Sequence, residues 1–373
     1  MKVLYDHQSF TGLTYGGVSR YFYNLMRSFA DYADVQFELS LRLSNNEYLN
    51  SASFSRHLRY RRMAHLQNVN RAASLLNRLY SLQRVRAGQY DLFHPTYYHR
   101  YFLKAIGNKP FVLTFHDATS ERFGRQYPQL GEGLYEAKKQ LLHRANAVIA
   151  VSHFTKDEII RYFPVQPEKI SVVHLGTTFG TLRVAQSPGT SGPVEPFPYL
   201  LYVGKRGLYK NFNGFFRAIR PVLSRHPDLH LICAGGGAFD ADEHALFHAT
   251  RLNERVHYRP ISDDSLFRLY QYARAFVFPS LNEGFGIPVL EAFSAGCPVV
   301  LSNRSSLPEV GAEAAVYFDP EVDESIAGAV ERVVTDEALR ADLSRRGTER
   351  LRHFSCDQTA RQTLAVYQSL LTA

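Results

Sequence analysis

The chain has 373 residues, enough for two domains of ordinary size with a hydrophobic core each. It is 45% hydrophobic and 21% charged, and it has no run of about 20 apolar residues that would cross a membrane. The three cysteines are far apart without a Cys-x-x-Cys pair, which argues against a disulfide framework or a zinc site and fits a reducing cytosol.

The charge is distributed unevenly. Residues 1–198 contain 24 Lys and Arg against 14 Asp and Glu, a net charge of +10, whereas residues 199–373 contain 19 against 21, a net charge of −2. Residues 56–104 hold ten basic residues and one acid, Asp91. Such a run is either a solvated surface or a face for an anionic partner. Lipid headgroups are favoured over nucleic acid, because no nucleic-acid-binding motif accompanies the charge.

In the first half, apolar runs of strand length alternate with segments of helical period. The residues Met1–Asp6, with a charge on each side of a short apolar run, are typical of a first strand and not of a signal peptide. This alternation predicts a parallel sheet buried on both faces. Strands are expected at 3–5, 35–41, 91–94, 111–115, 147–151 and 170–174, and helices at 18–32, 134–145 and 154–163.

Residues 181–198 are rich in proline and glycine and interrupt this alternation, so they predict a linker between two domains. The first domain is expected at 1–180 and the second at 199–355. In the second domain, strands are expected at 199–203, 229–234, 256–258, 275–278, 299–301 and 315–318, and helices at 211–225, 263–273, 287–295 and 323–334.

Ligands of doubly wound sheets bind beyond the carboxyl ends of the strands, so candidate site residues are expected directly after strands. Residues 279–292 follow a predicted strand and contain two glutamates eight positions apart. Glu283 falls in the loop and Glu291 about one turn into the next helix, while the N–H groups of Gly286 and Ile287 suit a phosphate. The carboxylates suit the hydroxyls of a ribose or a sugar. The alternative is a helix start with favourable acids, but Glu291 lies in an otherwise apolar helix.

Other candidates also follow predicted strands. Gly16 and Gly17 precede the first long helix, where they form either a tight turn or a close approach of the backbone to a diphosphate. His116 ends a strand, where a lone histidine is usually a satisfied polar residue. Arg206 and Lys210 follow the first strand of the second domain. Two cations there would stabilise the negative charge of a departing phosphate, unless they are merely solvated.

The segment EGFGIPVLEAFSAGCPVV, which begins at Glu283, resembles the signature of the retaining glycosyltransferases of family 4, which have the GT-B fold. Other marks of that family match between about residues 15 and 320. They are Gly16-Gly17, Thr114-Phe115-His116-Asp117, Val151-Ser152, Val203-Gly204-x-Arg206-x-x-x-Lys210-Asn211 and Pro308-Glu309-Val310. The resemblance implies an α/β protein with two Rossmann-like domains that face each other across a cleft. It also implies that the final helix, within 356–373, crosses back to the first domain.

The resemblance assigns roles to the candidate residues. Arg206 and Lys210 would act on the departing phosphate in place of a divalent metal, so the resemblance implies that no metal and no cofactor is needed. Lys205 is an alternative to Arg206, which we favour because arginine makes bidentate contacts. His116 would lie beside the donor sugar. The expected catalytic residues are Glu283, Arg206, Lys210 and His116. The expected donor-binding residues are Gly16, Gly17, Phe285, Gly286, Ile287 and Glu291.

The function implied is transfer of a hexose, with retention, from a nucleotide diphosphate sugar to a glycan acceptor. A GDP-sugar such as GDP-mannose is the first expectation for the donor, and a lipid-linked glycan in bacterial polysaccharide assembly is expected as the acceptor. The protein would then be cytoplasmic or peripheral on the inner face of the membrane. The alternatives are an inverting GT-B transferase, a sugar-nucleotide epimerase, or a non-catalytic scaffold that binds nucleotide sugars.

One segment lies outside these motifs. In residues 66–80, Leu66, Val69, Ala73, Leu76 and Tyr80 recur at helical spacing, with arginines nearby. The pattern predicts either a stripe that faces the core of an ordinary helix or a basic amphipathic helix that lies on a membrane.

Overall fold

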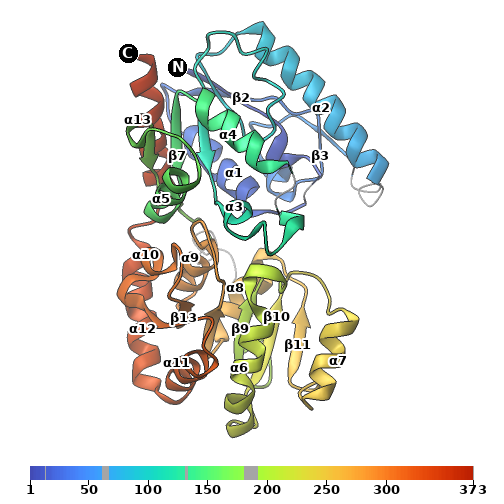
Figure 1. The fold of residues 1–373 in the computed structure, drawn as a ribbon, viewed down its shortest axis with the longest axis vertical. Coiled ribbons are helices and arrows are strands. Elements are labelled where there is room, and N and C mark those ends of the chain that lie inside the picture. Colours follow the sequence, from blue (N-terminus) through green and yellow to red (C-terminus); the bar gives the residue numbers. More distant parts are fainter. Residues whose placement is uncertain (13, 61–66, 131–132, 180–191, 373) are drawn as a thin grey trace. The chain divides into compact units, whose positions relative to one another are not determined.

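The computed structural model describes residues 1–12, 14–60, 67–130, 133–179 and 192–372 (Figure 1). The chain forms two compact units. The N-terminal unit comprises Met1–Gly176 together with Cys356–Ala373, and the C-terminal unit comprises Thr177–Ser355. Most of the predicted linker, residues 181–191, lies outside the described residues.

The N-terminal unit is built on parallel strands. One sheet has the order β2-β1-β5 and another the order β6-β7-β8, and a parallel bridge between Phe93 and Phe111 joins β5 to β6. A short pair, β3 with β4, lies apart. The bounds are β1 (Lys2–Tyr5), β2 (Gln36–Leu39), β3 (Leu43–Ser44), β4 (Leu58–Arg59), β5 (Leu92–His94), β6 (Val112–Phe115), β7 (Ala147–Ala150) and β8 (Ile170–Val172).

Helices connect these strands, as the alternation in the sequence predicts. Ser152 begins α5 because its hydroxyl accepts a hydrogen bond from the N–H of Thr155. The helical segments are η1 (Gln8–Phe10), α1 (Gly17–Phe29), η2 (Glu47–Ser51), α2 (Gln67–Ala87), α3 (Thr119–Phe123), η4 (Pro128–Leu130), α4 (Leu134–Arg144), α5 (His153–Tyr162), η5 (Pro167–Lys169) and the C-terminal α13 (Cys356–Leu371).

A buried chain of hydrogen bonds anchors α13 in the N-terminal unit. The hydroxyl of Tyr367 lies 2.9 Å from that of Tyr5 and 2.5 Å from Nδ1 of His94, whose Nε2 lies 2.9 Å from the hydroxyl of Thr114. Burial lowers the pKa of His94 to about 3. The ring is therefore neutral at physiological pH, with one nitrogen to donate and one to accept, which suits a position between two hydroxyls.

The C-terminal unit contains one six-stranded parallel sheet in the order β11-β10-β9-β12-β13-β14. The order reverses between β9 and β12, because the chain builds outward from β9 on one side and from β12 on the other. The carboxyl ends of these two strands are the switch point at which doubly wound sheets bind ligands. The bounds are β9 (Tyr199–Val203), β10 (His230–Ala234), β11 (Val256–Arg259), β12 (Ala275–Phe278), β13 (Val299–Ser302) and β14 (Ala315–Phe318).

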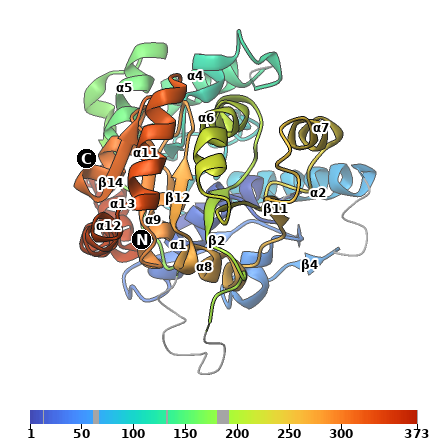
Figure 2. The same cartoon turned by 90° about the horizontal axis from the view of Figure 1, so that it is seen from below.

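Helices cover both faces of this sheet. Figure 2 shows α6 and α11 side by side on one face, where Phe212, Phe215 and Phe216 of α6 are fully buried. The helical segments are η6 (Leu208–Lys210), α6 (Phe212–Arg225), α7 (Ala241–Ala249), α8 (Asp263–Tyr272), α9 (Ile287–Ser294), α10 (Leu307–Gly311), η7 (Ala312–Ala314), α11 (Asp323–Thr335) and α12 (Glu337–Leu351). In the part of the chain that the structure describes, no helix combines the length and the apolar character needed to span a bilayer.

Candidate functional site

Two loops of the C-terminal unit meet at the switch point of its sheet. One follows β9 and carries Lys210, and the other follows β12 and carries Glu283. The N–H of Leu281 donates to the carbonyl oxygen of Tyr209 over 2.8 Å, which ties the loops together. Nζ of Lys210 lies 2.6 Å from Oε1 of Glu283. The structure thus brings these two predicted residues into contact, although 73 positions separate them in the sequence.

The backbone around Lys210 is unusual. Leu208 and Asn211 have φ of 57° and 54°, in the left-handed region that costs energy for residues other than glycine. The side chain of Asn211 holds the turn by donating to the carbonyl oxygen of Pro320 over 2.7 Å. The ammonium group of Lys210 lies 5.0 Å from the ring centre of Tyr209. A partly desolvated cation in this position acts more strongly on a nearby anion than one in bulk water.

Two serines after β13 hold the Glu283 loop. The N–H of Glu283 donates to the hydroxyl of Ser305 over 3.0 Å. The hydroxyl of Ser306 lies 2.9 Å from the carbonyl oxygens of both Glu283 and Phe285. We did not predict these serines, although the polar run 302–306 directly after a predicted strand is a signal that could have indicated them.

The turn into α9 requires glycine at position 286. Gly286 has φ of +103°, and a Cβ atom there would lie 2.9 Å from the side chain of Leu307. The first N–H groups of α9, including that of Ile287, have no partner within the helix and suit an anion. The ring of Phe285 is buried against that of Phe354, with ring centres 5.8 Å apart. Any contact of Phe285 with a donor would therefore be made by its backbone N–H.

Glu291 is a buried carboxylate in the second turn of α9. The residue is 6% exposed, and its Oε2 accepts a hydrogen bond of 3.3 Å from the hydroxyl of Tyr270 on α8. The residues beside it in the helix, such as Leu290 and Phe293, are apolar and buried. A carboxylate at this position is an acceptor that suits the hydroxyl groups of a ligand.

Arg206 differs from the expectation. Its guanidinium makes four hydrogen bonds within the C-terminal unit: two to the carboxylate of Glu243, at 2.5 and 3.1 Å, and two to the carbonyl oxygens of Gly235 and Ala238. The residue is 9% exposed, whereas Lys205 beside it is exposed. In this conformation Arg206 holds the loop after β10 and has no bidentate edge left for a phosphate. The preference for Arg206 over Lys205 as the phosphate contact is thus not supported, because Arg206 is already engaged.

The N-terminal unit holds the other predicted residues. Gly16 has extended backbone angles and caps α1, which begins at Gly17. His116 directly follows β6, and its ring packs edge-on against that of Tyr21 on α1, with centres 5.6 Å apart. The structure therefore brings α1 and the end of β6 together, so His116 and the Gly16-Gly17 turn belong to connected elements.

His116 is a neutral imidazole at physiological pH. Burial lowers the pKa of His116 to about 4. The nearby carboxylate of Asp117 acts to raise this pKa and the ammonium group of Lys138 to lower it, but burial has the largest effect. Its Nε2 is buried and has no hydrogen-bond partner among the described residues. Lys138, which we did not predict, is itself buried and donates to the carbonyl oxygen of Asp117 and to Glu121. The unmatched nitrogen of His116 suits a hydroxyl of a ligand.

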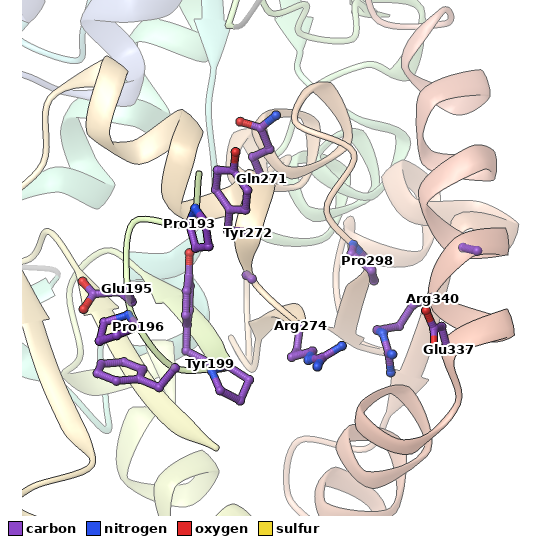
Figure 3. A pocket seen from close by; sticks show the side chains of 14 residues that line it. Pro193, Glu195, Pro196, Tyr199, Gln271, Tyr272, Arg274, Pro298, Glu337 and Arg340 are labelled. Carbon is purple, nitrogen blue, oxygen red and sulfur yellow. The ribbon is translucent and has the colours of Figure 1, made fainter. Parts of the chain in front are cut away.

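A cavity of about 570 Å³ lies elsewhere in the C-terminal unit (Figure 3). It is at the amino ends of the strands, next to Tyr199 at the start of β9, Arg274 before β12 and Pro298 before β13. None of the predicted site residues lines it. It is therefore at the opposite edge of the sheet from Lys210 and Glu283.

The chain matches two family models. Residues 15–178 match the model described as Glycosyltransferase Family 4, and residues 186–350 match the model described as Glycosyl transferases group 1. The two matches cover the N-terminal and the C-terminal unit, respectively, and include all the predicted site residues.

Curated proteins and solved structures are also similar. O-antigen chain mannosyltransferase B of Escherichia coli is 30% identical over 276 residues, which are 69% of this chain and 70% of that protein. O-antigen chain mannosyltransferase RfbU of Salmonella typhimurium is 29% identical over 196 residues, which are 52% of this chain and 53% of that protein. Sucrose-phosphate synthase from Thermosynechococcus elongatus has a TM-score of 0.76 at 20% identity, covering 100% of this chain and 99% of that one.

Proposed function

Because the chain belongs to glycosyltransferase family 4, and is a glycosyltransferase of the GT-B fold, we propose that it transfers a hexose from a nucleotide diphosphate sugar to a glycan with retention. The observation that carries this proposal is the Lys210–Glu283 pair at the switch point, directly before the start of α9. A cation, a carboxylate and a set of backbone N–H groups at one point match the phosphate and hydroxyl groups of such a donor.

Each residue has a distinct task in this proposal. The N–H groups of Gly286 and Ile287 bind the diphosphate, and Lys210 stabilises its negative charge as the bond to the sugar breaks. Glu291 accepts hydrogen bonds from the ribose, and Glu283 from the sugar. The neutral ring of His116 contacts a sugar hydroxyl.

The balance of the reaction needs no separate base. The bond between the anomeric carbon and the donor phosphate oxygen breaks, and the acceptor oxygen bonds to that carbon on the same face. The proton of the acceptor hydroxyl passes to the departing diphosphate. The positive charge of Lys210 replaces a divalent metal in this step, so we propose turnover without metal.

The donor and acceptor are proposed from the relatives. Both of the curated relatives described above are named O-antigen chain mannosyltransferases, which supports GDP-mannose as the first donor to test. Their names also support a glycan acceptor in polysaccharide assembly. A lipid-linked form of this acceptor, at the cytoplasmic face of the membrane, is part of the same proposal.

Turnover with a panel of donors tests the proposal. The protein is incubated with a lipid-linked glycan and with GDP-, UDP-, ADP- or dTDP-sugars, in EDTA and in magnesium. We expect nucleoside diphosphate release from GDP-mannose at equal rates in both, with an α-linked product by NMR. A β-linked product would indicate an inverting enzyme, activity restored only by metal would contradict the role of Lys210, and binding without any transfer would indicate a scaffold.

A further inference from the structure

The helix α2 buries a stripe of small and polar residues with one valine, and no large apolar side chain. Its residues that face the N-terminal unit are Ala73, Asn77, Ser81 and Val85, at successive spacings of four, and all are at most 2% exposed. The amide of Asn77 accepts from the N–H groups of Arg42 and Leu43 and donates to the carbonyl oxygen of Leu43. Ser81 is hydrogen-bonded to Ser40. The contact of α2 with its own unit is therefore complete without its large apolar side chains.

The leucines of α2 lie on the opposite face. Leu75, Leu76 and Leu79 are 47%, 53% and 54% exposed, and Leu82 is half-buried. The spacings of three and four among 75, 79 and 82 place these side chains along one face of the helix. The sequence pattern left open whether its residues face the core, and the structure divides them: Ala73 is buried, whereas Leu76 is exposed. Leu66, the first residue of that expected stripe, lies outside the described residues.

An exposed row of leucines on a long helix indicates a partner. Figure 1 shows α2 as a long helix at the outer edge of its unit. The charge of the helix determines which partner fits. Residues 67–87 contain four arginines and no acid. Arg84 is bound to Glu38 at 2.6 and 2.8 Å, so Arg71, Arg78 and Arg86 are the positive charges of the helix outside this pair.

A second copy of the chain fits this face poorly. Two such helices packed together through their leucines would bring like charges into contact with no acid on either helix to offset them. An anionic lipid surface offers both an apolar layer for the leucines and negative headgroups for the arginines. We propose that α2 lies in the interface of an anionic membrane, with Leu75, Leu76 and Leu79 inserted and Arg71, Arg78 and Arg86 at the headgroups.

This interaction goes beyond glycosyl transfer, since it would hold the N-terminal unit at a membrane whatever the donor is. It also differs from the purely electrostatic contact that the basic run 56–104 predicts. Two of the charges in that run, Arg59 and Arg84, are paired with Glu47 and Glu38. Because leucine insertion is insensitive to salt, binding should weaken at high salt but not vanish.

Vesicle cosedimentation separates the two contributions. Phosphatidylcholine vesicles with and without 30% phosphatidylglycerol are mixed with the full chain at low salt and in 0.5 M NaCl. We expect the strongest binding with the anionic lipid at low salt, and a weaker bound fraction, carried by the leucines, that persists in 0.5 M NaCl and with phosphatidylcholine alone. The double substitution Leu75→Gln with Leu79→Gln should lower the partition coefficient roughly tenfold for each leucine. Ile160→Gln, an exposed apolar residue of α5 in the same unit, is the matched control and should bind as the wild type.

A tryptophan reporter locates the insertion. The chain contains no tryptophan, so Leu79→Trp provides a single reporter on the proposed face and Ile160→Trp a control elsewhere. We expect anionic vesicles to shift the emission of the Leu79→Trp protein to the blue and brominated lipid to quench it, with no change for the control. An unchanged melting temperature would show that each variant is folded. An unchanged stabilisation by the donor would show that donor binding does not depend on the membrane-binding face of α2.

Three results would overturn the proposal. The first is wild-type binding by the leucine variant, and the second is complete release of the wild type in 0.5 M NaCl; either would leave only an electrostatic contact. The third is a dimer in light scattering without lipid that the leucine substitutions dissociate, which would identify a second copy as the occupant of this face.

Discussion

Lys205 and Arg206 are neighbours in one loop, but their surroundings differ. Arg206 is enclosed by Glu243 and two carbonyl oxygens, whereas Lys205 is exposed. In this arrangement Arg206 positions the loop after β10, and Lys205 is the cation that remains available beside Lys210. The order of the two residues along the chain gives no indication of this difference, because it depends on Glu243, 37 positions away.

Substitution distinguishes these roles. Replacing Arg206 with Ala should lower the free energy of unfolding by about 2–3 kcal/mol, because Oε1 of Glu243 and two carbonyl oxygens lose their donor, while Oε2 of Glu243 keeps only the N–H of Asp240. The estimate is below that for a fully buried pair, because the side chain of Glu243 is 14% exposed. Lys205→Ser should change this free energy by less than about 0.5 kcal/mol but lower kcat at least about tenfold. Urea denaturation and initial rates measure both; a fully active Lys205→Ser protein would remove Lys205 from the site.

The low pKa of His116 predicts a pH dependence of stability. The pKa is about 4 in the folded chain, against about 6.5 for an unperturbed histidine, so the unfolded state binds more protons between these values. This contribution to stability is fully present above pH 6.5 and is lost as the pH falls toward 4. The loss between pH 7 and pH 5 is about 2 kcal/mol.

Urea denaturation at a series of pH values tests this expectation. His116→Gln should remove most of this loss, whereas His143→Gln, an exposed residue of the same unit, should keep the wild-type profile. Identical profiles for the His116→Gln protein and the wild type would show that the pKa of His116 is the same in the folded and unfolded states, and would contradict the lowered pKa.

Among single residues, the sequence was most informative for charged residues that directly follow a predicted strand. It predicted Lys210, Glu283 and Glu291 in one site, and the structure places Lys210 and Glu283 in contact. It did not predict Tyr270, whose hydroxyl contacts Glu291, because a tyrosine in a helical pattern is indistinguishable from a core residue.

At the scale of elements, the loop between β12 and α9 depends on β13 for its shape. Ser306, after β13, is fully buried and holds the carbonyl oxygens of Glu283 and Phe285. Ser306→Ala should therefore lower the free energy of unfolding by about 1–2 kcal/mol and raise the KM for the donor, because Glu283 loses its fixed position. Ser224→Ala removes an exposed hydroxyl that bonds within α6 and is the control for both measurements. Equal KM values in the two variants would contradict the positioning role of Ser306.

The predicted strands agree closely with the observed ones, because most are short apolar runs, and central ones such as β7 and β12 are buried on both faces. All six strands predicted for the C-terminal unit are present, with shifts of a residue or so at their ends. Helices with few apolar residues were harder to predict. Among them, α7 and α12 were not predicted, because their sequences, ADEHALFHA and EALRADLSRRGTERL, have weak apolar periodicity. The orientation of α2 was unpredictable because amide and hydroxyl groups, those of Asn77 and Ser81, make up half of its buried stripe while its leucines are exposed.

At the scale of the whole molecule, the chain forms two compact units built on parallel strands, and the sequence predicted this architecture from the alternation of strands and helices and from the break at 181–198. The final helix, α13, belongs to the N-terminal unit, where Tyr367 contacts Tyr5 and His94. The apolar pattern of α13 does not predict which unit the helix packs against, because the contacts join residues more than 270 positions apart.

The central claim is that the nucleotide sugar binds at the switch point of the C-terminal sheet and not in the cavity at its opposite edge. Hydrogen exchange with mass spectrometry, with and without the donor that the panel identifies, tests this claim. We expect donor to slow exchange in residues 204–211 and 283–291, and this protection to be lost with Lys210→Ala. Protection confined to residues 193–199 and 271–274, which line the cavity in Figure 3, with none in the two loops, would contradict it.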